Sequence, residues 1–201
     1  VAGADRYMTM DLHAGQIQGF FSIPGDVLTA FHILIDYLKA LCPKLTNPTV
    51  VTTDLGFAKR GRNLAEDLNV PLALIEKRRA KSGATTEALN IVGEVKGCDI
   101  ILVDDEVDTA GSVAQAVTLL KEKGANDIYM VFVHPVLSGP AVDRLANLPL
   151  TKIITTDTVP IPQESLDVLG DKIEILSIAP LLGEVILRAH EGRSVGEMFN
   201  E

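Results

Sequence analysis

Residues 100–112, with the sequence IILVDDEVDTAGS, constrain this chain more than any other stretch. An apolar run ends abruptly in two carboxylates, a small polar turn follows, and residues 113–123 then have a helical pattern. This order predicts a strand, a loop and a helix. Free N–H groups and the helix dipole favour an anion at a helix N-terminus, so the turn is a candidate phosphate-binding loop: Asp108, Thr109, Ala110, Gly111 and Ser112.

The two carboxylates at the end of the apolar run, Asp104 and Asp105, suit a different part of a ligand. They would repel a phosphate, but they suit vicinal hydroxyls or a metal that carries the rest of the substrate. A diol site beside a phosphate loop predicts a sugar phosphate. The same pattern is also typical of a buried strand whose acidic residues lie at its solvated end, because short motifs specify function loosely.

Composition narrows the class of protein. With 201 residues, no Trp and only 4% aromatic residues, the core must be built from Val, Ile, Leu and Ala, which favours buried parallel strands covered by helices. A net charge of −9 argues against general nucleic-acid binding. Cys42 and Cys98 fit no metal or redox spacing and indicate thiols in a reducing compartment, which predicts a cytoplasmic protein. No apolar run is long enough to predict a membrane span.

Strand and helix patterns alternate along the chain, which predicts an α/β fold with a mostly parallel sheet and helices on both faces. The expected strands are residues 6–11, 49–53, 71–76, 99–104, 127–133, 152–156 and 173–176. The expected helices are residues 25–41, 57–68, 112–123, 139–147 and 179–190. Residues 78–90 are small, polar and basic, and we expect a long loop there, since such loops are often functional.

Three further groups are candidates for phosphate or metal chemistry. Asp11 and His13 end a strand on the same side and could meet a Mg²⁺-bound phosphate, although an isolated Asp-x-His is more often structural. Asp54 follows a strand and is either a metal ligand or an N-cap. Residues 76–81 form a basic cluster that is either placed to neutralise phosphates or part of a solvated loop.

A weak internal echo links two parts of the chain. Gly3 and Gly124 each begin a small turn that leads into an apolar strand, with His13 and His134 each ten residues after its glycine. A duplicated protein whose first half is missing would explain the echo, and the absence of Met at position 1 suggests a processed or truncated chain. Coincidence explains it equally well, because this joint is common in βαβ units.

Taken together, these residues resemble the ribose-phosphate pyrophosphokinase (phosphoribosyl pyrophosphate synthetase) family over essentially the whole chain. The stretches that carry the resemblance are residues 11–26, 50–60, 73–95 and 100–112. The family has two tandem domains of the type I phosphoribosyltransferase fold. The resemblance therefore implies a remnant of the first domain at 1–23, the second domain with the ribose 5-phosphate site at 24–178, and a C-terminal helix and tail at 179–201.

The resemblance implies transfer of diphosphate from Mg²⁺–ATP to the C1 hydroxyl of ribose 5-phosphate, giving phosphoribosyl pyrophosphate and AMP. Lys77 and Arg79 match the basic pair on the family's catalytic loop, Asp104 and Asp105 match carboxylates beside the ribose hydroxyls, and residues 108–112 match the 5-phosphate loop. His13 and Asp54 match positions associated with Mg²⁺, and Asp11 and Asp26 are further acidic metal candidates. The family also implies a homo-oligomer, a dimer or hexamer, with no nucleic-acid or membrane partner.

The chain departs from the family pattern at two positions. Ser22 stands where many members have an acidic residue, and Phe57 stands where many have a second glycine after Asp54. The first-domain segments that form much of the ATP site are also missing, so we expect this chain alone to be inactive. The alternatives are a non-catalytic regulatory partner, which the retained Lys77 and Arg79 disfavour, a simple phosphoribosyltransferase, which the stretch 11–21 disfavours, and a module that only senses a ribose phosphate.

Overall fold

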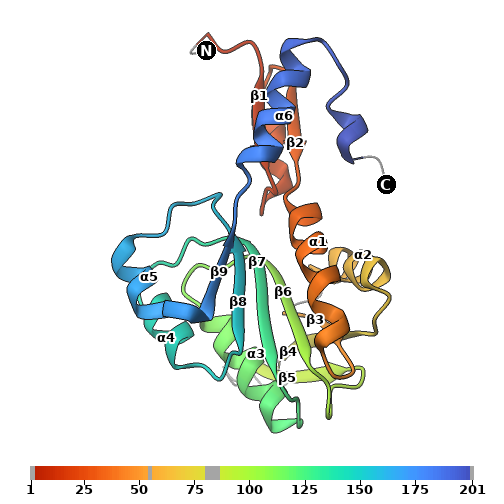
Figure 1. Ribbon diagram of the computed structural model, residues 1–201, viewed down its shortest axis with the longest axis vertical. Helices are drawn as coiled ribbons and strands as arrows, with labels where there is room; N and C mark the ends of the chain where they lie inside the picture. The colour runs from red at the N-terminus through yellow and green to blue at the C-terminus, as the bar shows by residue number, and fades with distance from the viewer. Residues whose placement is uncertain (1–2, 54–55, 80–86, 200–201) are drawn as a thin grey trace.

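The computed structural model describes residues 3–53, 56–79 and 87–199, and it has two parts (Figure 1). The larger part is a seven-stranded sheet covered by helices, and the smaller part is a strand pair with the last long helix beside it. The carboxyl ends of the parallel strands point toward the smaller part (Figure 1). That edge of the sheet is where α/β proteins place their ligand sites.

The large sheet has the strand order β5-β4-β3-β6-β7-β8-β9. Every neighbouring pair is parallel except β4 and β5, which form an antiparallel pair. The strands are β3 (Thr49–Thr52), β4 (Leu72–Arg79), β5 (Glu87–Val92), β6 (Ile100–Glu106), β7 (Ile128–His134), β8 (Lys152–Thr156) and β9 (Ile173–Leu176). Because β6 lies at the centre, the acidic residues that end it are surrounded by neighbouring strand ends.

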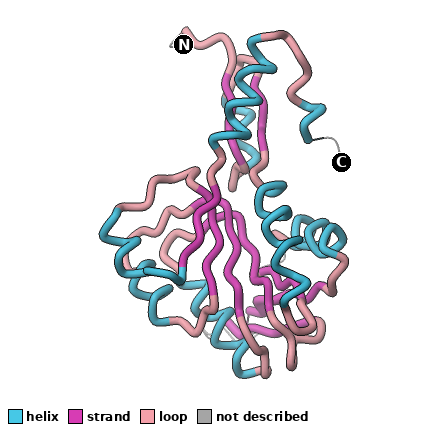
Figure 2. Tube along the Cα trace, viewed as in Figure 1, coloured by secondary structure: helices cyan, strands magenta, loops and turns pink. Residues whose placement is uncertain are grey.

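Helices cover both faces of this sheet (Figure 2), as the alternating side chains of the strands require. On β6, Ile100 and Leu102 pack in one cluster with α3 (Gly111–Glu122), α4 (Ala141–Asn147) and α5 (Gln163–Leu169). Ile101 and Val103 pack in the opposite cluster with α1 (Phe31–Leu41) and α2 (Ala58–Leu68). The predicted fold class, a mostly parallel sheet between two helix layers, is confirmed.

The smaller part joins the two ends of the chain. Strands β1 (Tyr7–Met10) and β2 (Gly25–Leu28) pair in parallel, and α6 (Ala179–His190) lies beside them (Figure 1). Leu28, Val185 and Val195 form its buried cluster. Four short 3₁₀ helices complete the described elements: Gly15–Phe20, Cys42–Lys44, Gly170–Lys172 and Gly196–Phe199. No helix within the described ranges is long and apolar enough to cross a membrane.

Two expected elements were wrong in extent. The helix predicted over residues 25–41 begins only at Phe31, since Gly25–Leu28 is a strand whose Gly25 lies against the Tyr7 ring; a Cβ there would approach ring atoms to 2.1 Å. Of the loop predicted over residues 78–90, the two ends are strand instead, because β4 continues to Arg79 and β5 begins at Glu87; residues 80–86 lie outside the described residues. The seven-residue α5 was not predicted, and the domain division stays a prediction, although β2 pairs across its 23/24 boundary.

Candidate functional site

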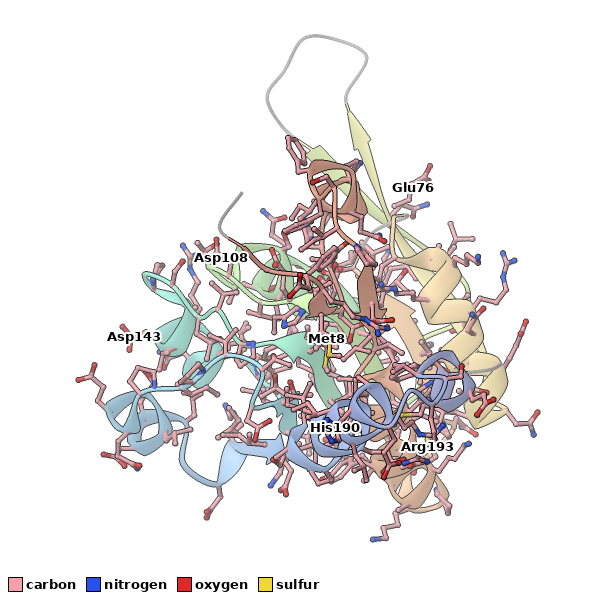
Figure 3. The ribbon with its side chains drawn as sticks, turned by 90° about the horizontal axis from the view of Figure 1, so that it is seen from above. Met8, Glu76, Asp108, Asp143, His190 and Arg193 are labelled. Atoms are coloured by element: carbon pink, nitrogen blue, oxygen red, sulfur yellow. The ribbon has the colours of Figure 1, made fainter. Side chains whose placement is uncertain are left out.

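The candidate site is a cleft of about 190 Å³ at the carboxyl end of β6. It is lined by His13 and by the continuous stretch from Asp104 to Val113. The structure therefore brings together three predicted groups: the phosphate loop, the two carboxylates and the imidazole. Figure 3 is seen from above the small part and labels Asp108 at this cleft.

The loop from Asp108 to Ser112 has the geometry of an anion-binding turn. Ala110 adopts the left-handed backbone conformation, with φ 57°, and α3 begins at the next residue, Gly111. No side chain caps the N-terminus of α3. Its first N–H groups, which have no partner inside the helix, therefore face the cleft without a competing protein acceptor from a capping side chain, and the helix dipole adds positive potential there.

Asp104 is held by protein donors on both of its oxygens. The Thr53 hydroxyl donates to Oδ2 at 2.5 Å, and the backbone N–H of Asp105 donates to Oδ1 at 2.9 Å. Burial raises the pKa of Asp104 to about 7, although both hydrogen bonds act in the opposite direction. Asp104 is thus a fixed carboxyl group that titrates near neutrality.

Asp105, the second carboxylate, contacts the imidazole that the small part supplies. Nδ1 of His13 lies 3.0 Å from Oδ2 of Asp105 and 3.8 Å from a carboxylate oxygen of Glu106. The hydrogen bond to Asp105 raises the pKa of His13, and the negative charge of Asp105 adds to this effect. The contact ties residue 13 of the small part to the central strand of the large sheet.

Two of the predicted metal residues do not reach this cleft. The Asp11 side chain is 1% exposed and accepts hydrogen bonds from the Thr29 hydroxyl at 2.9 Å and the Ala30 N–H at 2.7 Å. This is the structural alternative that an isolated Asp-x-His left open. Asp26 lies on β2 and forms an ion pair with Arg6 at 2.6 Å.

The remaining predicted site residues are Asp54, Lys77 and Arg79. Asp54 lies outside the described residues. The backbones of Lys77 and Arg79 belong to β4, where they pair with Leu89 and Glu87 of β5. The basic pair that the family resemblance placed on a catalytic loop therefore belongs to strand β4.

The described cleft side chains alone do not form a metal site, so a metal ion would need further ligands from a bound substrate. Within the described ranges, no three His, Cys, Asp or Glu side chains are grouped so that they could hold a metal ion. Mg²⁺ usually keeps several waters and binds through one or two carboxylates together with substrate phosphates. The carboxylates of Asp105 and the half-buried Glu106 fit this mode, so the residues present suit a Mg²⁺ that arrives with a phosphate-bearing ligand.

Sequence reasoning missed three residues that support the site. Thr53 was not singled out, although parallel pairing of β3 with β6 predicts that strand ends at Thr53 and Asp104 lie side by side. Ser138 donates from its hydroxyl to Asp108, and Arg144 donates from Nη1 to the Thr109 carbonyl at 2.8 Å. The last two contacts join residues 30 and 35 positions apart, for which the sequence has no local signal.

Fold and site together define the class of protein: a phosphoribosyltransferase-like α/β protein whose central strand ends in two carboxylates before an uncapped helix N-terminus. A family model described as the phosphoribosyl synthetase-associated domain matches residues 81–200. The chain belongs to this phosphoribosyl synthetase family.

Individual relatives agree. The chain is 49% identical to a ribose-phosphate pyrophosphokinase of Caldanaerobacter subterraneus subsp. tengcongensis and 46% identical to ribose-phosphate pyrophosphokinase 1 of Streptococcus agalactiae; the matches cover 98% and 99% of this chain and 61% of each relative. The crystal structure of phosphoribosylpyrophosphate synthetase from Mycobacterium smegmatis matches with a TM-score of 0.84 and 40% identity, covering 95% of this chain and 60% of that chain. The chain thus spans about three fifths of the length of these relatives.

Proposed function

We propose that this chain carries the ribose 5-phosphate site of a ribose-phosphate diphosphokinase. The enzyme transfers diphosphate from ATP to the C1 hydroxyl of ribose 5-phosphate and releases phosphoribosyl pyrophosphate and AMP. The observation that carries the proposal is the single cleft in which a carboxylate pair and an uncapped helix N-terminus adjoin. Membership of the phosphoribosyl synthetase family supports the reaction.

In this proposal the two halves of the cleft bind the two ends of the sugar. The N–H groups of residues 108–112 bind the 5-phosphate, because a helix N-terminus pairs donors with positive potential. Asp104 and Asp105 accept hydrogen bonds from the ribose hydroxyls and fix the orientation of the ring. The C1 hydroxyl is then directed toward the part of the cleft that His13 lines.

Catalysis is assigned to positioning and charge stabilisation, which dominate phosphoryl transfer. Lys77 and Arg79 lie on β4, two strands from β6, and neutralise charge that develops on the transferred group. His13 and Asp54 hold the nucleotide with its Mg²⁺, which when bound neutralises phosphate oxygens. Asp11 and Asp26 would have to exchange their present partners to bind a metal.

We also propose a cytoplasmic homo-oligomer, either a dimer or a hexamer. Both cysteines are free thiols, in keeping with a reducing compartment. The 3₁₀ helix Gly15–Phe20 exposes large apolar side chains: Ile17 is 42% and Phe20 is 89% exposed. An apolar surface of this kind is typical of a protein interface.

The substitution Ser112→Glu tests the phosphate loop. It adds a carboxylate in the first turn of α3, so we expect ribose 5-phosphate binding to be lost in isothermal titration calorimetry. Thr118→Glu is the matched control, since Thr118 is also exposed on α3 but lies farther along the helix. Unchanged affinity in Ser112→Glu would reject the assignment of the loop to the 5-phosphate.

A further inference from the structure

The charge balance of the cleft does not suit a phosphate. Among the described residues, the lining has four acidic side chains, Asp104, Asp105, Glu106 and Asp108, and the imidazole of His13, but no Lys or Arg. A helix N-terminus contributes the equivalent of only about half a positive charge. A phosphomonoester that enters this cleft therefore needs a further cation close to the loop.

Arg144, on α4, is the residue that brings a cation to the loop. Its Nη1 atom donates to the carbonyl of Thr109 at 2.8 Å. The same atom would lie 3.7 Å from a Cβ built on Gly111, so the guanidinium is beside the first residue of α3. A guanidinium has five N–H donors in a fixed planar fork, and the Thr109 carbonyl engages one of its two terminal nitrogens.

The segment that leads from β7 into α4 forms hydrogen bonds that fix the position of Arg144 relative to the loop. The N–H of Leu137 donates to the carbonyl of Val107 at 2.9 Å, and the N–H of Val107 donates to the carbonyl of His134 at 3.0 Å. The Ser138 hydroxyl donates to the Asp108 carboxylate. The segment between β7 and α4 thus holds the backbone just before the loop and the side chain of its first residue, and it leads into the helix that carries Arg144.

We propose that Arg144 is a further specificity residue of the ribose 5-phosphate site, whose guanidinium offsets the cleft carboxylates and makes the loop select a phosphorylated sugar. This inference rests on the proposed function, since it assumes that the loop binds the 5-phosphate. The observation that supports it is the position of the Arg144 guanidinium beside the N-terminus of α3, where its hydrogen bond to the Thr109 carbonyl holds it.

The experiment measures ribose 5-phosphate and inorganic phosphate binding to the 201-residue chain by calorimetry at low and high salt. Arg144→Met should weaken ribose 5-phosphate binding on the order of tenfold or more, because it removes a charge-assisted donor. Arg144→Lys should restore part of the affinity. Arg62→Met, which removes the same charge from an exposed position on α2, should have no effect.

Two further readouts separate charge from structure. The loss in Arg144→Met should shrink at high salt, because added ions screen exposed charges. All four proteins should unfold at similar temperatures, since Arg144 is exposed. Equal affinities in the wild type and Arg144→Met would overturn the inference, and so would a Lys variant as weak as the Met variant with the same loss at high salt.

Failure of the proposed function gives a different pattern. Arg144-dependent binding of inorganic phosphate without binding of ribose 5-phosphate would reject the sugar site but keep Arg144 as an anion-binding residue. Binding of neither compound to the wild type would overturn both. Tight ribose 5-phosphate binding that is indifferent to residue 144 would keep the proposed function and reject only the role of Arg144.

Discussion

At the scale of single residues, two effects act on the pKa of Asp104 in opposite directions: burial raises it, and the hydrogen bonds to its carboxylate lower it. Its pKa is about 7 in the folded chain, against an ordinary value of 3.8. Between these two values the folded protein keeps a proton that the unfolded chain has lost. The contribution of Asp104 to the free energy of unfolding therefore falls as the pH rises from about 4 to about 7. Above this range Asp104 is a half-buried carboxylate that depends on its hydrogen bonds for stabilisation.

The substitution Thr53→Val tests this dependence. It removes the donor at 2.5 Å from Asp104, so the pKa of Asp104 should rise further. At pH 8, where the carboxylate is charged, the loss should be about 1.5–3 kcal/mol, and at pH 5 it should be nearer 1 kcal/mol, since hydrogen bonds to charged groups are stronger. Urea unfolding at both pH values and an NMR titration of the carboxyl carbon measure the two effects.

Thr118→Val is the control for this comparison. The Thr118 hydroxyl donates to the Ala114 carbonyl within α3, and neither group titrates. The change in the free energy of unfolding should therefore be the same at pH 5 and pH 8. If Thr53→Val shows no pH dependence either, the hydroxyl does not stabilise the ionised form of Asp104.

At the scale of elements, two helical glycines have opposite roles. Gly61 on α2 faces β3 so closely that a Cβ would approach Cγ2 of Thr52 to 2.2 Å. Gly183 on α6 has open space around the same position. We expect Gly61→Ala to destabilise the protein by about 1–3 kcal/mol through overpacking, whereas Gly183→Ala should stabilise it by about 0.5–1 kcal/mol.

Urea unfolding of the two alanine variants checks this pair. Each variant is the control for the other, because both introduce the same methyl group within a helix. A stabilising effect of Gly61→Ala would mean that α2 can move away from β3 at little cost. Nothing in the sequence distinguishes the two glycines, since only the distance between a helix and its strand does so.

The sequence predicts elements with a strong local pattern, but it does not contain the distances between elements. Strand β6 and helix α3 follow from a continuous apolar run and a helical period, because both are local patterns. Strand β5 was missed although Leu89 and Ile91 pack inward and Asn90 does not, since a polar stretch precedes that short alternation. The sequence predicted the acidic end of β6. The hydrogen bonds from Ser138 to Asp108 and from Arg144 to the Thr109 carbonyl form only when distant segments fold together.

At the scale of the whole molecule, two histidines form hydrogen bonds between the small part and the large sheet. His13 reaches Asp105 on β6, and His134 at the end of β7 lies 2.9 Å from the carbonyl oxygen of Asp11. The two histidines of the internal echo thus each form a contact between the small part and the same edge of the large sheet. As a result, His13, which we propose for the nucleotide side, lines the same cleft as Asp104 and Asp105, which we propose for ribose.

Whether the chain can position both substrates is a second question at the scale of the whole molecule. Phosphoryl transfer requires both substrates to be positioned, and misplacing one of them by about 1 Å can cost roughly a hundredfold in rate. The cleft is the site that we propose for ribose 5-phosphate, and the chain spans 61% of the length of its relatives. We therefore expect the 201-residue chain to bind ribose 5-phosphate but to form product at least a hundredfold more slowly than a full-length relative.

Incubation of the purified chain with ATP, Mg²⁺, inorganic phosphate and ribose 5-phosphate tests this last prediction, with AMP release as the readout. Calorimetry on the same preparation is the control, because intact ribose 5-phosphate binding shows that the cleft is folded. AMP release without ribose 5-phosphate measures the background. Rapid AMP formation that depends on ribose 5-phosphate would contradict the prediction, since both reactants would then have to be held within these 201 residues.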